Sequence, residues 1–242
     1  MTDYRIGNLA LGIPPRVVGT LCERQSLPCA CPTDNRTCDI IEVRLDCIGP
    51  DTQGWLRDCQ SIESAGFPVV LTLRSAREGG KWKSRETERE SLLSVALDGL
   101  ASIDIEWSSK LRDPLCRQAI RAGKSVIISH HNFKGTPSFR TLNAVLERIL
   151  DIPCAIPKIS TMINTKSDIG TLKRLLEAHS ERPCCVIGMG SKGIKTRALF
   201  PCLGSCLAYG YLDSPIAPGQ VPSRVLVKAI RELNAACKDR NT

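Results

Sequence analysis

The sequence predicts an α/β protein built as one closed barrel of eight strand–helix units, with an irregular first unit. Short apolar runs alternate with amphipathic stretches from one end of the chain to the other. The apolar runs are nearly continuous, which is typical of parallel strands that are covered on both faces. Eight such units in 242 residues fit a closed barrel better than an open sheet. The predicted fold class is therefore a single (β/α)8 TIM barrel.

The elements follow one another in a regular order after the first unit. The expected strands are residues 17–21, 40–46, 69–74, 102–107, 125–129, 154–160, 184–189 and 206–209. The expected helices are residues 86–98, 111–122, 139–150, 168–179 and 224–236. The first connection, residues 22–38, holds Pro28 and Pro32 and has little 3.6-residue periodicity. It is predicted to be a loop or a degraded helix, which makes the first unit irregular.

One domain is expected over residues 1–242, with residues 1–15 as an N-terminal extension, because no long linker or Gly/Ser tract divides the chain. Hydrophobic residues make up 42% and charged residues 24%, which are ordinary globular values. No apolar stretch approaches the ~18 residues of a membrane helix, so no membrane partner is expected. The first 15 residues show no signal-peptide pattern. A cytoplasmic location is therefore expected.

The net charge of +8 is spread along the chain rather than gathered in a stripe. Aromatic residues are only 4%, which leaves no stacking platform for single-stranded nucleic acid. Nucleic acid is therefore not an expected partner. A small anionic substrate accounts equally well for a basic site.

Thirteen cysteines are an unusually high number. Without a secretory signal they are expected to be reduced thiols that fill the core or lie in loops. Cys22, Cys29, Cys31 and Cys38 crowd one connection, which leaves a structural zinc site as an alternative. Their spacing is not a paired C-x-x-C pattern and no histidine is nearby, so the thiol interpretation is preferred.

Lys158 lies inside an expected strand, between Ile156 and Ile159, where burial would desolvate its amine. Desolvation lowers the pKa of an amine toward neutrality. A neutral amine can attack a ketone and form a Schiff base. His131 follows another apolar strand and would be placed to move protons beside the iminium. The two residues together predict covalent catalysis through a lysine imine.

Charged and polar residues gather where the expected strands end, which is where barrel enzymes carry their catalytic groups. They are Glu42, Arg44, Arg74, Glu78, Asp104, Glu106, His130, His131, Lys158 and Arg197. Glu42 and Arg44 are two residues apart, so both side chains face the same side of their strand. Taken alone, they also fit a structural ion pair. Further charged residues on other strands favour a position in the lumen of the barrel.

The three histidines differ in their expected roles. His130 and His131 are adjacent, so their side chains point to opposite faces of a strand and only one enters the lumen directly. A histidine at a strand end also fits a packed, structural role. His179 lies near the end of an expected helix, where a surface position or an interaction with the helix dipole is expected.

Seven segments in a fixed order resemble type I 3-dehydroquinate dehydratase, the third enzyme of the shikimate pathway. They are residues 39–46 (DIIEVRLD), 71–80 (LTLRSAREGG), 103–106 (IDIE), 129–137 (SHHNFKGTP), 157–159 (PKI), 189–197 (MGSKGIKTR) and 217–220 (APGQ). The resemblance spans almost the whole chain from Arg16 onward. It implies a lyase that converts 3-dehydroquinate to 3-dehydroshikimate by syn elimination, in chorismate and aromatic amino acid biosynthesis.

The resemblance also implies the catalytic roles. Lys158 is similar to the Schiff-base lysine that attacks the C3 ketone of 3-dehydroquinate. His131 would act as the general base on C2, protonate the departing C1 hydroxyl and later assist hydrolysis of the imine. Glu78 would orient that histidine. The family needs no metal and no organic cofactor, because the iminium is the electron sink, and a homodimer is expected.

The remaining predicted site residues bind the substrate. Arg197 would hold the substrate carboxylate in bidentate fashion, which suits a planar guanidinium. The resemblance assigns the other hydroxyl- and carboxylate-binding positions to Glu42, Arg44, Arg74 and Gln220.

Two positions depart from the family pattern. Asn132 replaces the aspartate of the His-Asp-Phe motif and removes one charge near the base. Ile216 falls where the family has a substrate-binding serine, and Ser214 in the same loop is a candidate replacement. Two alternatives stay open: a non-catalytic relative that binds the ligand as a sensor or regulator, and a Schiff-base aldolase on the same barrel. Arg197 and residues 218–220 match the dehydratase.

Overall fold

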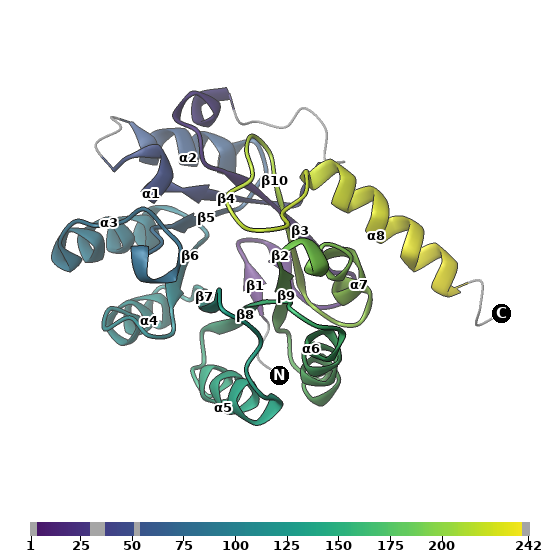
Figure 1. The fold of residues 1–242 in the computed structure, drawn as a ribbon. Coiled ribbons are helices and arrows are strands. Elements are labelled where there is room, and N and C mark those ends of the chain that lie inside the picture. The colour runs from purple at the N-terminus through teal and green to yellow at the C-terminus, as the bar shows by residue number, and fades with distance from the viewer. Residues whose placement is uncertain (1–3, 30–36, 51–53, 239–242) are drawn as a thin grey trace.

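Eight parallel strands form a ring at the centre of the computed structural model, which describes residues 4–29, 37–50 and 54–238 (Figure 1). The strands are β3 (Arg16–Leu21), β4 (Ile40–Arg44), β5 (Val69–Thr72), β6 (Ser102–Glu106), β7 (Val126–Asn132), β8 (Ala155–Met162), β9 (Cys185–Met189) and β10 (Leu207–Tyr211). They are paired in the order β10-β3-β4-β5-β6-β7-β8-β9. A parallel bridge between Cys184 and Ser205 links the two ends of this order. The predicted (β/α)8 barrel is confirmed.

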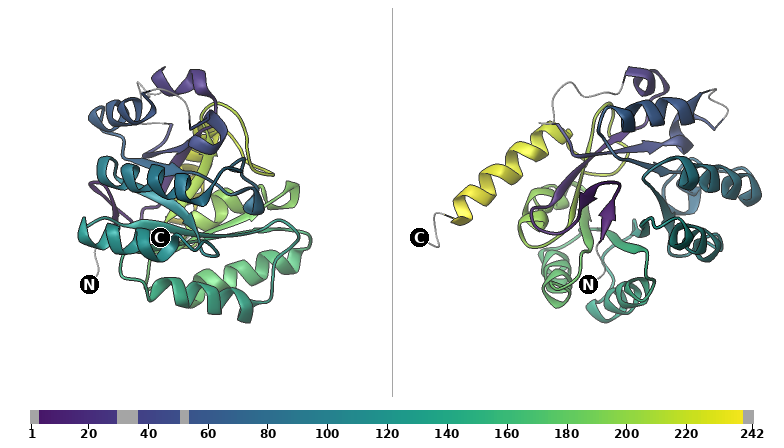
Figure 2. Two further views of the ribbon diagram at one scale, coloured as in Figure 1. Left: turned by 90° about the vertical axis from the view of Figure 1, so that its left-hand side faces the viewer. Right: turned by 180° about the vertical axis from the view of Figure 1, so that it is seen from behind.

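Helices surround the ring of strands on its outside (Figures 1 and 2). They are α1 (Leu45–Ile48), α2 (Trp55–Ser64), α3 (Glu86–Gly99), α4 (Arg112–Arg121), α5 (Phe139–Leu150), α6 (Lys166–Ala178), α7 (Thr196–Cys202) and α8 (Ser223–Lys238). Three of these helices, α1, α2 and α7, are not among those named from the sequence. Two of them, α1 and α7, are too short to show helical periodicity. None of the helices in the described ranges is long and apolar enough to cross a membrane.

The connection between β3 and β4 is irregular, as predicted. Within its described residues the chain forms only the 3-10 helix η1 (Arg24–Cys29), whose Leu27 is buried. Cys31 and the side chain of Cys29 lie outside the described residues, so the zinc alternative stays untested. No cluster of three or more metal-binding side chains occurs in the rest of the chain that the structure describes.

Six strands end one to three residues away from the predicted position, and two of these differences affect the site. β4 ends at Arg44, and Asp46 belongs to α1, because its carboxylate accepts hydrogen bonds from the Arg44 guanidinium and from the backbone N–H of Lys81. β7 continues to Asn132 instead of ending at residue 129. His131 is paired with Ser160 of β8, so the histidines lie within the strand.

The apolar residues form two cores on either side of the barrel wall. Side chains such as Val18, Ile40 and Ile127 fill the lower part of the lumen. Their neighbours in sequence, such as Val17 and Ile41, face the helices and belong to the larger outer core. This alternation follows from the two-residue period of a strand. It leaves the upper part of the lumen for polar side chains.

A short hairpin near the N-terminus closes the lower end of the barrel. It consists of β1 (Arg5–Ile6) and β2 (Leu9–Ala10), and it crosses the centre of the ring in the view from behind (Figure 2, right). Ile6 is fully buried in the inner core. The predicted extension, residues 1–15, therefore contributes to the core over the part that the structure describes.

Candidate active site

The polar residues of the site come from lumen-facing positions near the C-terminal ends of the strands and from the segments that follow them. Along β8, Ile156 lies in the lower core, whereas Lys158 and Ser160 follow at two-residue intervals and line a pocket above it. Along β4, Ile40 is likewise followed by Glu42. Each of these strands thus supplies both an apolar residue below the pocket and a polar residue that lines it.

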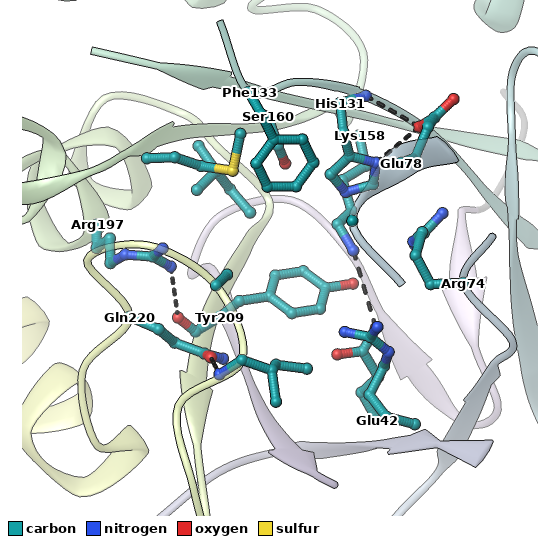
Figure 3. Close-up of a pocket in the computed structure, with 16 residues that line it drawn as sticks. Glu42, Arg74, Glu78, His131, Phe133, Lys158, Ser160, Arg197, Tyr209 and Gln220 are labelled. Atoms are coloured by element: carbon teal, nitrogen blue, oxygen red, sulfur yellow. Dashed lines mark hydrogen bonds and ion pairs between the residues drawn. The ribbon is translucent and has the colours of Figure 1, made fainter. Parts of the chain in front are cut away.

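A pocket of about 540 Å³ at this end of the barrel opens to solvent (Figure 3). All eight predicted site residues line it: Glu42, Arg44, Arg74, Glu78, His131, Lys158, Arg197 and Gln220. Phe133, Met189, Tyr209 and Ile216 also line the pocket, and none of them was assigned a binding role from the sequence. His130 does not line the pocket, in agreement with the opposite directions expected for adjacent strand residues.

Lys158 points into the pocket and is 5% exposed. Its Nζ lies 2.9 Å from Oδ2 of Asp104 and 3.9 Å from Oε1 of Glu42. The same nitrogen lies 4.1 Å from the centroid of the Tyr209 ring, a cation–π distance. The expected burial of Lys158 is present. The amine is also held by two carboxylates and an aromatic face.

Asp104 connects Lys158 to a buried network across three strands. Its Oδ1 accepts a hydrogen bond of 2.6 Å from the Ser129 hydroxyl and lies 2.7 Å from Nη2 of Arg74. Burial alone would raise the pKa of Asp104, but the charges of Arg74 and Lys158 and the Ser129 hydrogen bond hold it well below its ordinary value. Asp104 therefore stays ionised. Arg74, predicted to bind substrate, lines the pocket with its charge already compensated by Asp104 and Glu106.

His131 and Glu78 form a hydrogen-bonded pair on the wall of the pocket (Figure 3). Nδ1 of His131 lies 2.9 Å from Oε2 of Glu78, and the His131 backbone N–H donates to the same oxygen. The other carboxylate oxygen accepts a hydrogen bond of 2.8 Å from the Ser108 hydroxyl. Because Glu78 accepts from Nδ1, that nitrogen carries the proton and Nε2 keeps its lone pair.

Burial lowers the pKa of His131 well below 6.5, and the charges of Arg74 and Lys158 lower it further, against the opposing effect of Asp104. Burial raises the pKa of Glu78, although the Ser108 hydrogen bond and the Arg74 charge oppose the shift. The imidazole is therefore neutral near pH 7 and fits the role of a general base.

Phe133 lines the pocket and stacks on His131, with ring centroids 6.2 Å apart. Gly79 permits this position, since a Cβ atom there would overlap the Phe133 ring. Asn132 uses its Oδ1 to accept hydrogen bonds from the backbone N–H groups of Lys134 and Gly135. The departure from the family's aspartate thus lies at the last residue of β7, where its side chain holds the turn that carries Phe133.

Arg197 differs from the other arginines of the pocket because its described surroundings contain no carboxylate. It extends from α7 and donates to the carbonyl oxygens of Tyr209, at 3.2 Å, and Pro218, at 3.1 Å. Its Nε is buried and has no hydrogen-bond partner among the described residues. Burial lowers the pKa of Arg197 to about 10. A buried cation without an anion is costly, so this position favours an anionic ligand.

Glu42, Arg44 and Gln220 complete the set of predicted binding residues. The Glu42 carboxylate accepts hydrogen bonds of 2.9 Å from the hydroxyls of Thr20 and Thr72, and Arg44 is held by Asp46 through two hydrogen bonds of 2.9 Å. Oε1 of Gln220 accepts from the backbone N–H of Ile216 in the loop after β10, at 2.9 Å. All three side chains are therefore fixed in place by their neighbours.

The loop after β10 does not replace the expected serine. Ile216 lines the pocket, whereas Ser214 is turned toward Glu23, to which its hydroxyl donates a hydrogen bond. The sequence also left two residues next to Lys158 without a role: Asp104, which is the partner of its amine, and Tyr209, which lines the pocket. Both were recognisable as lumen-facing residues close to strand ends.

A buried lysine beside carboxylates and a neutral histidine, at the C-terminal end of a (β/α)8 barrel, is the site of a Schiff-base lyase. The family model of type I 3-dehydroquinase matches residues 24–236. The chain belongs to the type I 3-dehydroquinase family, which catalyses the dehydration step of the shikimate pathway and whose characteristic mechanism passes through a Schiff base.

Relatives from methanogenic archaea and several solved structures are similar to this chain. It is 35% identical over 226 residues to the 3-dehydroquinate dehydratase of Methanosarcina barkeri, covering 89% of this chain and 93% of that protein. The 3-dehydroquinate dehydratase of Methanocaldococcus jannaschii is 35% identical over 190 residues, covering 76% and 82%. The crystal structure of the Aquifex aeolicus 3-dehydroquinate dehydratase has a TM-score of 0.77 at 28% identity, covering 89% and 97%. The Geobacillus kaustophilus enzyme, at 22% identity and a TM-score of 0.84 over 94% and 95%, supports the fold.

Proposed function

We propose that this chain dehydrates 3-dehydroquinate to 3-dehydroshikimate through an imine on Lys158. The observation that carries the proposal is the position of the Lys158 amine: it is buried in the pocket, and the neutral His131 imidazole lines the same wall (Figure 3). An amine and a base in one pocket are the two groups that an imine-based elimination requires.

In the first half of the reaction Lys158 binds the substrate covalently. Its amine gives up one proton and adds to the C3 carbonyl; that proton returns when the adduct loses water, which leaves an iminium between Nζ and C3. The Lys158 side chain extends from β8, and Asp104 and Glu42 determine where its Nζ lies. The iminium then withdraws electrons from C2, which makes the hydrogen on C2 acidic.

In the second half His131 transfers the protons. Nε2 removes the proton from C2, and the electron pair of that C–H bond moves toward the iminium to give an enamine. The enamine then expels the C1 hydroxyl, which leaves as water after it takes the proton back from His131. Water finally adds to the iminium and releases the ketone product from Lys158. Glu78 holds the imidazole in the required tautomer throughout.

Recognition of the substrate is divided between charged and neutral groups. Arg197 is proposed to bind the carboxylate, because its buried guanidinium has no anionic partner among the described residues and its Nε is unpaired. Arg44 and Arg74 already have carboxylate partners. Arg44, Arg74 and Gln220 are proposed to donate to uncharged oxygens of the ring, and Glu42 is proposed to accept from a ring hydroxyl. The reaction requires no metal and no organic cofactor, since the iminium is the electron sink.

The test is an ultraviolet assay for the conjugated enone product, combined with borohydride trapping. Purified protein should convert 3-dehydroquinate to a product that absorbs in the ultraviolet, an outcome that neither a ligand sensor nor an aldolase would give. Borohydride added with substrate should reduce the imine and leave the ligand on Lys158. The Lys158→Ala variant should lose the label and nearly all turnover.

The matched control is Lys166→Ala, at an exposed lysine in the first turn of α6. It should keep both labelling and turnover. Peptide mapping that placed the reduced ligand on Lys134, Lys166 or Lys192 would contradict the assignment of Lys158.

The chain is further proposed to act as one catalytic domain over residues 1–242, as a homodimer in the cytoplasm. The dimer is supported by the family resemblance and by exposed apolar side chains on α7 and α8, which pack side by side (Figure 1). Leu199 and Leu203 are 38% and 37% exposed, and Val225 is 50% exposed. Light scattering on the purified protein tests the dimer: a monomer at micromolar concentration would rule it out.

A further inference from the structure

Tyr209 is a pocket residue whose hydroxyl has no partner. It lies in β10, is 5% exposed and lines the pocket. Its hydroxyl is buried and has no hydrogen bond to any residue that the structure describes. Leaving a buried hydroxyl unpaired is unfavourable, and such groups in folded proteins call for an explanation. In a ligand pocket, an unpaired hydroxyl is available to a ligand.

The position of the ring limits which part of a ligand the hydroxyl reaches. Nζ of Lys158 lies 4.1 Å from the ring centroid. Figure 3 shows the hydroxyl directed toward Lys158 and the Glu42 side of the pocket, with His131 beyond the amine. The Tyr209 backbone carbonyl also holds Nη1 of Arg197. Tyr209 therefore lies between the group that binds the ketone carbon and the cation proposed to bind the carboxylate.

The ring atoms next to the imine carbon indicate which substrate group the Tyr209 hydroxyl contacts. In the proposed reaction Lys158 holds C3, and His131 removes a proton from C2. The other ring neighbour of C3 is C4, which carries a hydroxyl in 3-dehydroquinate. With C2 facing His131, C4 faces the opposite side of the amine, where Tyr209 and Glu42 lie (Figure 3).

We propose that the Tyr209 hydroxyl forms a hydrogen bond with the C4 hydroxyl of the bound substrate and so makes the site selective for an α-hydroxy ketone over a simple ketone. The inference rests on the proposed function. Burial raises the pKa of Tyr209 well above 10.0, and the charge of Glu42 raises it further, so the phenol remains protonated and can donate. Glu42 on the same side of the amine can only accept a hydrogen bond, and Ile216 offers no polar side-chain atom, so neither can donate to the C4 oxygen.

The test compares Tyr209→Phe with the wild-type protein on two substrates, 3-dehydroquinate and its 4-deoxy analogue. The substitution keeps the ring beside Lys158 and removes only the hydroxyl. A single neutral hydrogen bond corresponds to about a twofold to tenfold loss of kcat/KM on 3-dehydroquinate. No loss should occur on the 4-deoxy analogue, because it lacks the partner. An equal loss on both substrates, or no loss on either, would overturn the inference.

Two controls separate this inference from a structural role and from the proposed function. Tyr211→Phe makes the same change two residues further along β10, at a residue that does not line the pocket, and should leave both rates unchanged. Thermal unfolding of Tyr209→Phe should show no loss of stability, since the removed hydroxyl has no partner within the described structure. If the wild-type protein forms no product, the proposed function fails. If it does and Tyr209→Phe matches it on both substrates, only the role of Tyr209 fails.

Discussion

Burial and two neighbouring cations keep the His131 imidazole neutral, and this determines the pH range in which the site can work. The pKa of His131 is lowered well below 6.5, first by burial and then by Arg74 and Lys158. Only the neutral form can accept the C2 proton. Activity that depends on His131 is therefore present at pH 6.5 and above, and it is lost as the pH falls through the lowered pKa.

The pH profile of kcat/KM should accordingly have its acidic limb below 6.5, the ordinary value for histidine. His131→Ala should lower kcat by about 10²–10⁴, the usual contribution of general acid–base catalysis. His130→Ala is the matched control, because His130 lies on the same strand and outside the pocket. A limb centred above 6.5, or a larger loss in His130→Ala, would show that a different group is the base.

The lowered pKa of His131 also makes the stability of the fold depend on pH. Below pH 6.5 the unfolded chain takes up a proton at His131 while the folded chain does not. The contribution of His131 to the free energy of unfolding is therefore fully present above 6.5 and is lost as the pH falls toward the lowered pKa.

Substitutions of Arg197 separate the contribution of its charge to substrate binding from that of its planar geometry. Arg197→Ala should raise KM by about tenfold or more, because a hydrogen bond to a charged group is worth about 1.5–3 kcal/mol. Arg197→Lys keeps the charge but loses the planar pair of donors, so a smaller increase is expected. Steady-state kinetics with 3-dehydroquinate measures both.

Lys195→Ala serves as the control, since Lys195 is an exposed cation two residues away that does not line the pocket. Wild-type kinetics in Arg197→Ala would show that another group binds the carboxylate, and Lys192 would then be examined together with Lys195.

At the scale of elements, the 3-10 helix η2 (Ala76–Glu78) after β5 positions Glu78 beside His131, the proposed catalytic pair. It ends at Gly79, whose φ is 77°, in the left-handed region. Phe133 from the turn after β7 packs where a Gly79 side chain would be. The loop after β5 and the turn after β7 thus both require a glycine at position 79.

Gly79→Ala should lower both stability and activity. The left-handed backbone costs about 1–2 kcal/mol for a residue with a Cβ atom. The methyl group would also displace Phe133, which stacks on His131. Small displacements of catalytic groups are costly, so kcat/KM should fall about tenfold or more. Chemical denaturation and steady-state kinetics measure the two effects.

Gly66→Ala is the control for backbone strain alone. Gly66 has a φ of 96° and no atom within 4 Å of a Cβ built on it. It should lose stability and keep full activity. Equal activity in the two variants would mean that the position of Phe133 does not affect the site.

At the scale of the whole molecule, the barrel is closed at one end by the N-terminal hairpin and used for chemistry at the other. Ile6 is fully buried among lumen residues such as Val18 and Ile127. The pocket lies above this apolar layer. Stability and catalysis are therefore carried by different ends of the same strands, as is usual in this fold.

Ile6→Ala should lower the free energy of unfolding by about 2–5 kcal/mol, the usual cost of this truncation in a core. The value of kcat should not change, because the hairpin does not line the pocket. Ile13→Ala is the control, since Ile13 is 87% exposed, and it should have almost no effect on stability. Similar, small effects of both substitutions would show that the hairpin adds nothing to the barrel.

The sequence alone was sufficient for the properties that depend on local periodicity. Near-continuous apolar runs identified the eight barrel strands, and the two-residue period placed Glu42 and Arg44 on one face and separated His131 from His130. The predicted site residues all line one pocket, because strand ends of a closed barrel converge. Their roles in catalysis and binding stay predictions. Local periodicity was least informative for short elements such as α1.

Only the tertiary structure decided which charges are paired across the lumen. Asp104 and Lys158 are 54 residues apart in sequence, and nothing local indicates that they meet. The same holds for Arg197, which has two carbonyl partners, and for Tyr209, whose hydroxyl has none among the described residues. Which charged side chains meet depends on the register of neighbouring strands and on which side chains share the lumen. The sequence therefore specifies the groups of the site, and the closed barrel determines their partners.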